Sequence, residues 1–157
     1  AGSPPPRTRT RSLTPGATAL LVEAARRSSI VRTLLEELDQ TDVVVYVSDS
    51  MSGADGEPRA YLGFVGHAAG IRYVLVRIEP RCMPASESIA VLAHELQHAV
   101  EVALAPDVRD AASLARLYRH IGWESGRGRF ETDRARSTGD RVRRQLAERP
   151  LRESPRP

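Results

Sequence analysis

Apolar and polar positions alternate along this chain in two periods, and the change between them divides it into expected helices and strands. Residues 17–38 repeat apolar side chains at helical spacing, with Ser28-Ser29 as a break between two helices. The same period returns in the second half of the chain, with Ser86 and Asp110 as expected N-caps. It predicts three more helices, over residues 86–105, 110–121 and 130–148.

The strand period occupies the stretch between these helical segments. Residues 42–48 are dense in β-branched side chains and predict a buried strand. A polar loop follows, and residues 60–66 and 70–80 then flank a short turn containing Gly66 and Gly70, which predicts a β-hairpin. The half-polar alternation of the second hairpin strand favours an edge position.

This order of elements predicts an α+β fold in one domain. Residues 17–148 supply the core, whereas residues 1–16 and 149–157 are rich in Pro, Arg and Ser and are expected to be disordered tails. The antiparallel hairpin predicts a small, mainly antiparallel sheet. No stretch reaches the roughly 18 consecutive apolar residues of a membrane span, so we expect none.

One motif points to chemistry. Residues 94–98 read HELQH, which places His94 and His98 four residues apart on one face of the expected helix. Two imidazoles so placed can bind one zinc ion, which in catalytic sites takes three protein ligands and leaves a position for water. Glu95, next to the first histidine, is placed to take the proton of that water. Chance occurrence on an amphipathic helix is the rival interpretation.

The third ligand is less directly indicated. Periodicity places Glu131 at the start of the inward face of the last expected helix, where an unpaired carboxylate would be costly. Glu131 is therefore the first candidate, and the alternatives are Asp133, Glu124 and Glu101. Glu101 follows His98 by one turn and is better suited to pair with an arginine or to support a histidine than to bind the metal itself.

The strings HELQHAVEVA and RFETDRA, with a hairpin before them, resemble the gluzincin group of zinc metallopeptidases, the thermolysin-like proteins and small bacterial relatives among them. The resemblance covers about residues 40–148. It implies a zincin-like fold, peptide-bond hydrolysis, zinc ligands at His94, His98 and Glu131, and a general base at Glu95. The sequence departs from thermolysin-like patterns after Glu131, where ETDRA lacks the usual acid three or four residues further on. The hydrogen-bond partner of His94 therefore stays unassigned.

Several other residues have weaker claims. Tyr118 and His120 lie between the two metal-binding segments and are candidates for stabilising an oxyanion, although either could be an ordinary helix residue. His67 is expected in an exposed turn. The single Cys82 cannot form an internal disulfide. The arginines of the last helix are expected to form a solvated face, with steering of carboxylates toward the cleft as the alternative.

Charge and composition limit the partners. The formal net charge is +3, and the two tails contribute +5 of it, so the body is slightly acidic. With few aromatic residues and no basic stripe on the body, no nucleic-acid binding is expected. We expect a monomer acting on a peptide or protein, with an extended peptide adding along residues 70–78. The start at Ala1 is compatible with removal of an export signal, and a cytoplasmic location is the alternative.

The sequence thus predicts a zinc metallopeptidase. The first rival is a zinc-binding but catalytically silent regulatory or binding module. The second rival is a helical interaction protein in which the HExxH motif is accidental.

Overall fold

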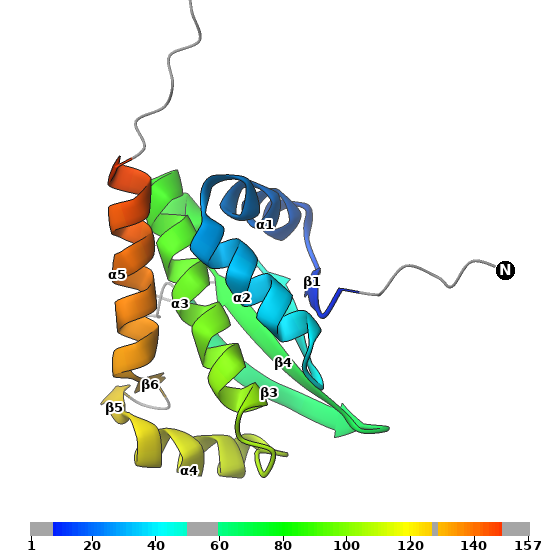
Figure 1. The fold of residues 1–157 in the computed structure, drawn as a ribbon. Helices are drawn as coiled ribbons and strands as arrows, with labels where there is room; N and C mark the ends of the chain where they lie inside the picture. The colour runs from blue at the N-terminus through cyan, green and yellow to red at the C-terminus, as the bar shows by residue number, and fades with distance from the viewer. Residues whose placement is uncertain (1–7, 50–59, 127–128, 149–157) are drawn as a thin grey trace, which may run out of the picture.

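The computed structural model describes residues 8–49, 60–126 and 129–148. Helices, a four-stranded mixed sheet and a separate two-stranded sheet make up most of these residues, and the four-stranded sheet lies behind the helices in Figure 1. The helices are α1 (Pro15–Arg27), α2 (Ser29–Asp39), α3 (Ala85–Ala103), α4 (Ala111–Ile121) and α5 (Asp133–Glu148). The strands are β1 (Thr10–Ser12), β2 (Val43–Ser48), β3 (Ala60–Ala68), β4 (Ile71–Ile78), β5 (Trp123–Gly126) and β6 (Arg129–Glu131), and Pro80–Cys82 form a 3-10 turn. The α+β class is therefore confirmed.

The larger sheet has the strand order β1-β2-β4-β3. β1 and β4 both pair with β2 in parallel, and only β3 and β4 are antiparallel. The expectation of a mainly antiparallel sheet was therefore wrong for this sheet. Two pairings were missed: β2 lies parallel to β4, and β1, whose sequence Thr-Arg-Ser has no apolar pattern, is held by parallel pairing with β2.

The predicted edges of the domain and of the sheet also need correction. Residues 10–16 belong to β1 and the start of α1 rather than to a tail, while residues 1–7 and 149–157 lie outside the described residues, as does the polar loop at 50–59. β4 is an interior strand with neighbours on both sides, so residues 70–78 are not an edge. The edge strands are β1 and β3. The edge prediction for this strand failed because Arg72, although charged, is buried beside Val74 and Val76.

The helix predictions were mostly confirmed. Ser28 separates α1 from α2, where its hydroxyl accepts a hydrogen bond from the backbone N–H of Val31. Asp110 caps α4 in a capping box with Ser113. Ser86 is not the cap of α3, because that helix already begins at Ala85 after Pro84.

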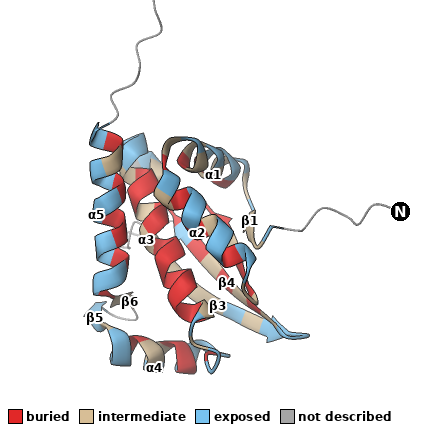
Figure 2. Ribbon diagram, viewed as in Figure 1, coloured by how far each residue is buried: buried red, intermediate tan, exposed pale blue. Residues whose placement is uncertain are grey.

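α3 is the central element of the helical layer. Its buried residues Ile89, Leu92 and Leu96 belong to one core cluster with Val31 and Leu38 of α2, with Val43, Val45 and Val47 of β2, and with Val74 and Val76 of β4. Buried positions lie along α3 and on the side of α5 that faces it (Figure 2). The side chains of α3 are therefore closely packed around most of the helix. Among the described residues, no helix has the length and apolar character needed to cross a membrane.

Candidate metal centre

α3 brings the two motif histidines together. His94 and His98 lie one turn apart, and their ring centroids are 4.9 Å apart at an angle of 79°. Both rings, together with Glu95, line a pocket of about 150 Å³. The rest of its wall comes from three regions: residues 60–62 of β3, Tyr118 of α4, and residues 125 and 129–131 of the β5–β6 hairpin. The histidines thus face a cavity and not the core.

Glu131 completes the cluster. Its Oε1 atom lies 3.2 Å from Nε2 of His94 and 3.8 Å from Nε2 of His98. Ligand atoms of these three residues all lie within 4.8 Å of one another, which could hold a metal ion. Among the residues that the structure describes, Asp133, Glu124 and Glu101 do not belong to this cluster. The structure therefore brings together His94, His98 and Glu131, which the sequence favours as the three metal ligands.

The prediction that Glu131 begins the inward face of a helix was nevertheless wrong. Glu131 is the last residue of β6 rather than part of a helix, and α5 begins only at Asp133. Its position depends on the β5–β6 hairpin, in which Glu131 pairs with Trp123. A Cβ atom added at Gly122 would lie 2.0 Å from the carbonyl oxygen of Glu131. Glycine at 122 thus permits the close approach that places the carboxylate, and this was the signal that periodicity overlooked.

A second layer of polar groups fixes His98. Its Nδ1 atom lies 2.9 Å from Oε2 of Glu101, and the hydroxyl of Thr132 donates a hydrogen bond of 2.6 Å to the other oxygen of that carboxylate. Thr132 also accepts a hydrogen bond from the backbone N–H of Ala135, so it caps α5. The expectation that Glu101 supports a histidine is confirmed. With Nδ1 engaged by Glu101, Nε2 of His98 is the nitrogen that faces the pocket.

The charged groups of the pocket shift one another's pKa values. Burial raises the pKa of the Glu95 carboxyl, against the smaller effect of the two histidines. Burial is the largest single effect on Glu131 and opposes its ionisation, but the contacts with His94, the backbone N–H of Thr132 and His98 together outweigh burial and lower the pKa of Glu131. Burial likewise tends to lower the pKa of His94, and the contacts with Glu131 and Glu95 raise it on balance.

The two oxyanion candidates lie in different places. The Tyr118 ring packs edge-on against His98, with centroids 5.1 Å apart, and stacks on Phe130. Its hydroxyl donates a long hydrogen bond of 3.4 Å to the carbonyl of His98, and burial raises its pKa well above the usual value. His120 is exposed on α4 and is not part of the pocket wall. Tyr118 is thus a wall residue, and only it has a position from which to contact a ligand.

Comparison with protein-family models, with curated proteins and with solved structures finds no match. The resemblance to gluzincins consequently depends on the sequence motifs alone.

Proposed function

We propose that this chain is a zinc-dependent peptidase in which His94, His98 and Glu131 hold the metal. The observation that supports this most directly is the convergence of two imidazole nitrogens and one carboxylate oxygen on a pocket. Two histidines and a glutamate are a donor set that catalytic zinc sites use. When bound there, zinc supplies Lewis acidity, which lowers the pKa of water and polarises a carbonyl group.

Glu95 is the proposed general base. It follows the first histidine, lines the same pocket and is almost completely buried. Because burial raises its pKa, its carboxyl holds a proton more firmly than a solvated glutamate does. A carboxylate of this kind can take a proton from water and return it to the departing amine.

A peptide is the proposed substrate because of the strand beside the pocket. Residues 60–62 of the edge strand β3 form part of the pocket wall. An extended peptide can pair with a free strand edge through main-chain hydrogen bonds. Pairing along β3, instead of residues 70–78, would draw a peptide across the pocket that contains Glu95.

The zincin-like architecture belongs to the same proposal. A strand-edged pocket lies in front of the helix with the HExxH motif, and the third candidate ligand comes from a later segment, as the resemblance implies. These features concern the order and arrangement of the elements. They support the proposal together with the donor set, and metal and activity measurements test it.

Metal content and hydrolysis test the proposal together. The purified chain should contain one zinc ion per molecule, and His94→Ala should reduce this to a trace, because two remaining ligands bind weakly. Glu95→Gln should keep the zinc and lower cleavage of an unfolded protein by about a hundredfold, since it removes the proton acceptor but keeps the shape. Glu36→Gln, at an exposed position of α2, is the matched control.

Each rival has its own result in this experiment. Equal, substoichiometric metal in wild type and His94→Ala would show that the motif is accidental. Stoichiometric zinc without cleavage of several unfolded substrates would identify a silent zinc module. Unchanged cleavage by Glu95→Gln would remove Glu95 from the mechanism.

A further inference from the structure

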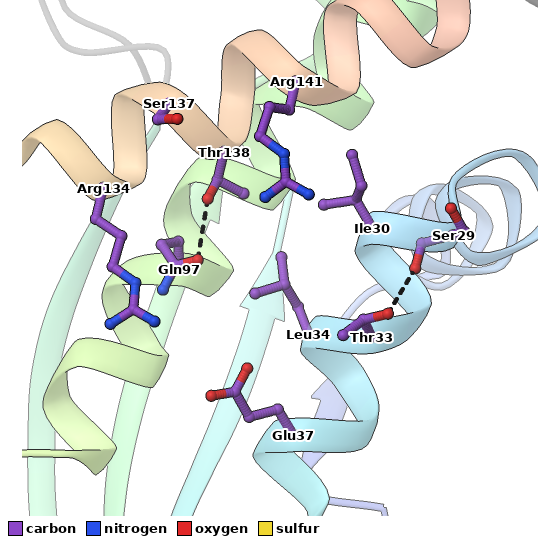
Figure 3. Close-up of a pocket in the computed structure, with 10 residues that line it drawn as sticks. All are labelled: Ser29, Ile30, Thr33, Leu34, Glu37, Gln97, Arg134, Ser137, Thr138 and Arg141. Atoms are coloured by element: carbon purple, nitrogen blue, oxygen red, sulfur yellow. Dashed lines mark hydrogen bonds between the residues drawn. The ribbon is translucent and has the colours of Figure 1, made fainter.

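A second cavity lies beside α3, in the space that α2 and α5 enclose (Figure 3). Its volume is about 410 Å³, within the range of small-molecule sites. Its wall shares no residue with the pocket of the metal centre. A function for this cavity is therefore independent of the proposed peptidase activity.

Gln97 is the polar residue of α3 in this wall. It is only 6% exposed, and its Oε1 atom accepts a hydrogen bond of 3.0 Å from the hydroxyl of Thr138. Its Nε2 atom is buried and has no hydrogen-bond partner among the described residues. A buried amide donor without an acceptor is unfavourable, so a ligand that supplies an acceptor here removes that penalty.

Two arginines of α5 line the same cavity. Arg134 and Arg141 are seven residues apart, which is two helical turns, so they share one face of α5. Their guanidinium groups extend from α5 toward α3 and α2 on either side of Thr138 (Figure 3). Neither forms an ion pair with any described residue, unlike Arg143 of the same helix, which pairs with Glu87 and Asp140. Together with the Gln97 amide they form a set of donors suited to a carboxylate.

The wall from α2 adds a different chemistry. Ile30 and Leu34 give it an apolar part, and Glu37 one turn further places a carboxylate at its end. Glu37 makes no ion pair within the described part of the chain. A negative charge at this end disfavours a second acid group on the ligand and favours an amino group. The wall therefore combines cationic, apolar and anionic regions.

We propose that this cavity binds a zwitterionic apolar amino acid. Its carboxylate would contact Arg134, Arg141 and the amide of Gln97. Its side chain would pack on Ile30 and Leu34, and its ammonium group would face Glu37. The arginines at 134 and 141 thus have a ligand-binding role, rather than forming only a solvated face.

Three related probes separate the parts of this proposal. L-leucine has the carboxylate, the ammonium group and a branched side chain; 4-methylpentanoate lacks the amine, and 3-methylbutylamine lacks the carboxylate. Titration of the full ¹⁵N-labelled chain should show saturable leucine binding that shifts the side-chain NH₂ signal of Gln97. Both other probes should bind more weakly, and the amine most weakly. A Gln97 side-chain signal that leucine leaves unmoved would overturn the proposal.

Variants assign the contacts. Arg141→Gln should weaken leucine binding by about tenfold, the order of one charged hydrogen bond. Glu37→Gln should weaken leucine but not 4-methylpentanoate. Arg144→Gln, an exposed position of α5 outside the cavity, is the matched control and should change neither. Equal leucine affinity in Arg141→Gln and wild type would refute the site.

His94→Ala separates this proposal from the metal centre. If leucine binds in the cavity, its affinity should survive in His94→Ala, whatever that variant's zinc content. Loss of leucine binding in that variant would place the amino acid at the metal centre and refute the cavity proposal.

Discussion

Two buried polar networks meet α3, and they differ in whether a pocket opens onto them. In the first, which we call the Arg72 network, the guanidinium of Arg72 donates two hydrogen bonds of 2.7 Å to Asp42. It also donates to four backbone carbonyls at and beyond the C-terminal end of α3, those of Val102, Ala103, Ala105 and Val108. All three of its nitrogen atoms are therefore engaged by protein groups, and the helix end is tied to β4.

The second, the His98 network, joins His98, Glu101 and Thr132. One end of it is closed by the cap of α5, and the other end, Nε2 of His98, faces the pocket beside Glu131. A network whose polar atoms are all engaged by protein groups can only stabilise the fold. A network that exposes a nitrogen to a pocket can also bind a ligand. Under the proposed function, the Arg72 network serves stability alone, whereas the His98 network both caps α5 and positions a metal ligand.

The largest expected effect tests the closed network. Arg72→Ala should lower the free energy of unfolding by about 3 kcal/mol, because it leaves carbonyls at the end of α3 without donors and creates a cavity. Urea unfolding followed by circular dichroism measures this change. Arg77→Ala, at an exposed position of the same strand, is the control and should cost far less. Equal losses would show that the Arg72 contacts do not stabilise the protein.

Thr132 should give the next largest effect, since it belongs to the His98 network and also caps α5. Thr132→Val should cost about 2 kcal/mol of unfolding free energy through loss of the cap and of the hydrogen bond to Glu101. Thr132→Ser keeps the hydroxyl and should restore most of this stability. If the serine variant is as unstable as the valine variant, loss of the methyl group costs as much as loss of the hydroxyl, and the hydrogen bonds are not the main contribution of Thr132.

Much of the fold and part of the site could be predicted from the sequence, for physical reasons that particular residues show. α3 has a long apolar face and two histidines at helical spacing, so local pattern alone placed His94 and His98 correctly. β1 has no such pattern, and Arg72 appears polar although it is buried, because pairing and hydrogen bonds distant in sequence determine both. Glu131 was identified by a periodicity that does not extend to it, and the chain approach at Gly122 explains its position.

The open network should respond through metal affinity more than through stability. Under the proposed function, Glu101→Gln should weaken zinc binding by roughly tenfold, because the carboxylate no longer increases the basicity of His98. A competition titration with a chelator measures the affinity. The melting temperature of the zinc-free protein should change little, since glutamine can still accept from Nδ1 of His98. A large fall in that melting temperature with unchanged zinc affinity would show that Glu101 stabilises the fold and does not tune the metal site.

The smallest effect concerns Asp42, the half-exposed end of the Arg72 network. Its hydrogen bonds with Arg72 lower the pKa of the Asp42 carboxyl, although partial burial acts in the opposite direction. A carboxyl whose pKa is lower in the folded state contributes stability that is fully present above its unfolded pKa of about 3.9, and this stability is lost as the pH falls through the folded value. Solvent screening keeps the contribution small.

Asp42→Asn should therefore be less stable than wild type at pH 7, and the difference between the two proteins should shrink as the pH falls below about 4. Urea unfolding of both proteins at several pH values isolates Asp42, because the other carboxyls titrate in both. Asp39→Asn, at an exposed position whose carboxylate accepts a hydrogen bond from the backbone N–H of Arg9, serves as a comparison for a carboxyl that forms no ion pair with an arginine among the described residues. A difference between wild type and Asp42→Asn that stays constant from pH 7 to pH 3 would mean that the charge of Asp42 adds nothing to the closed network, and that Arg72 stabilises the protein through the carbonyls of α3 alone.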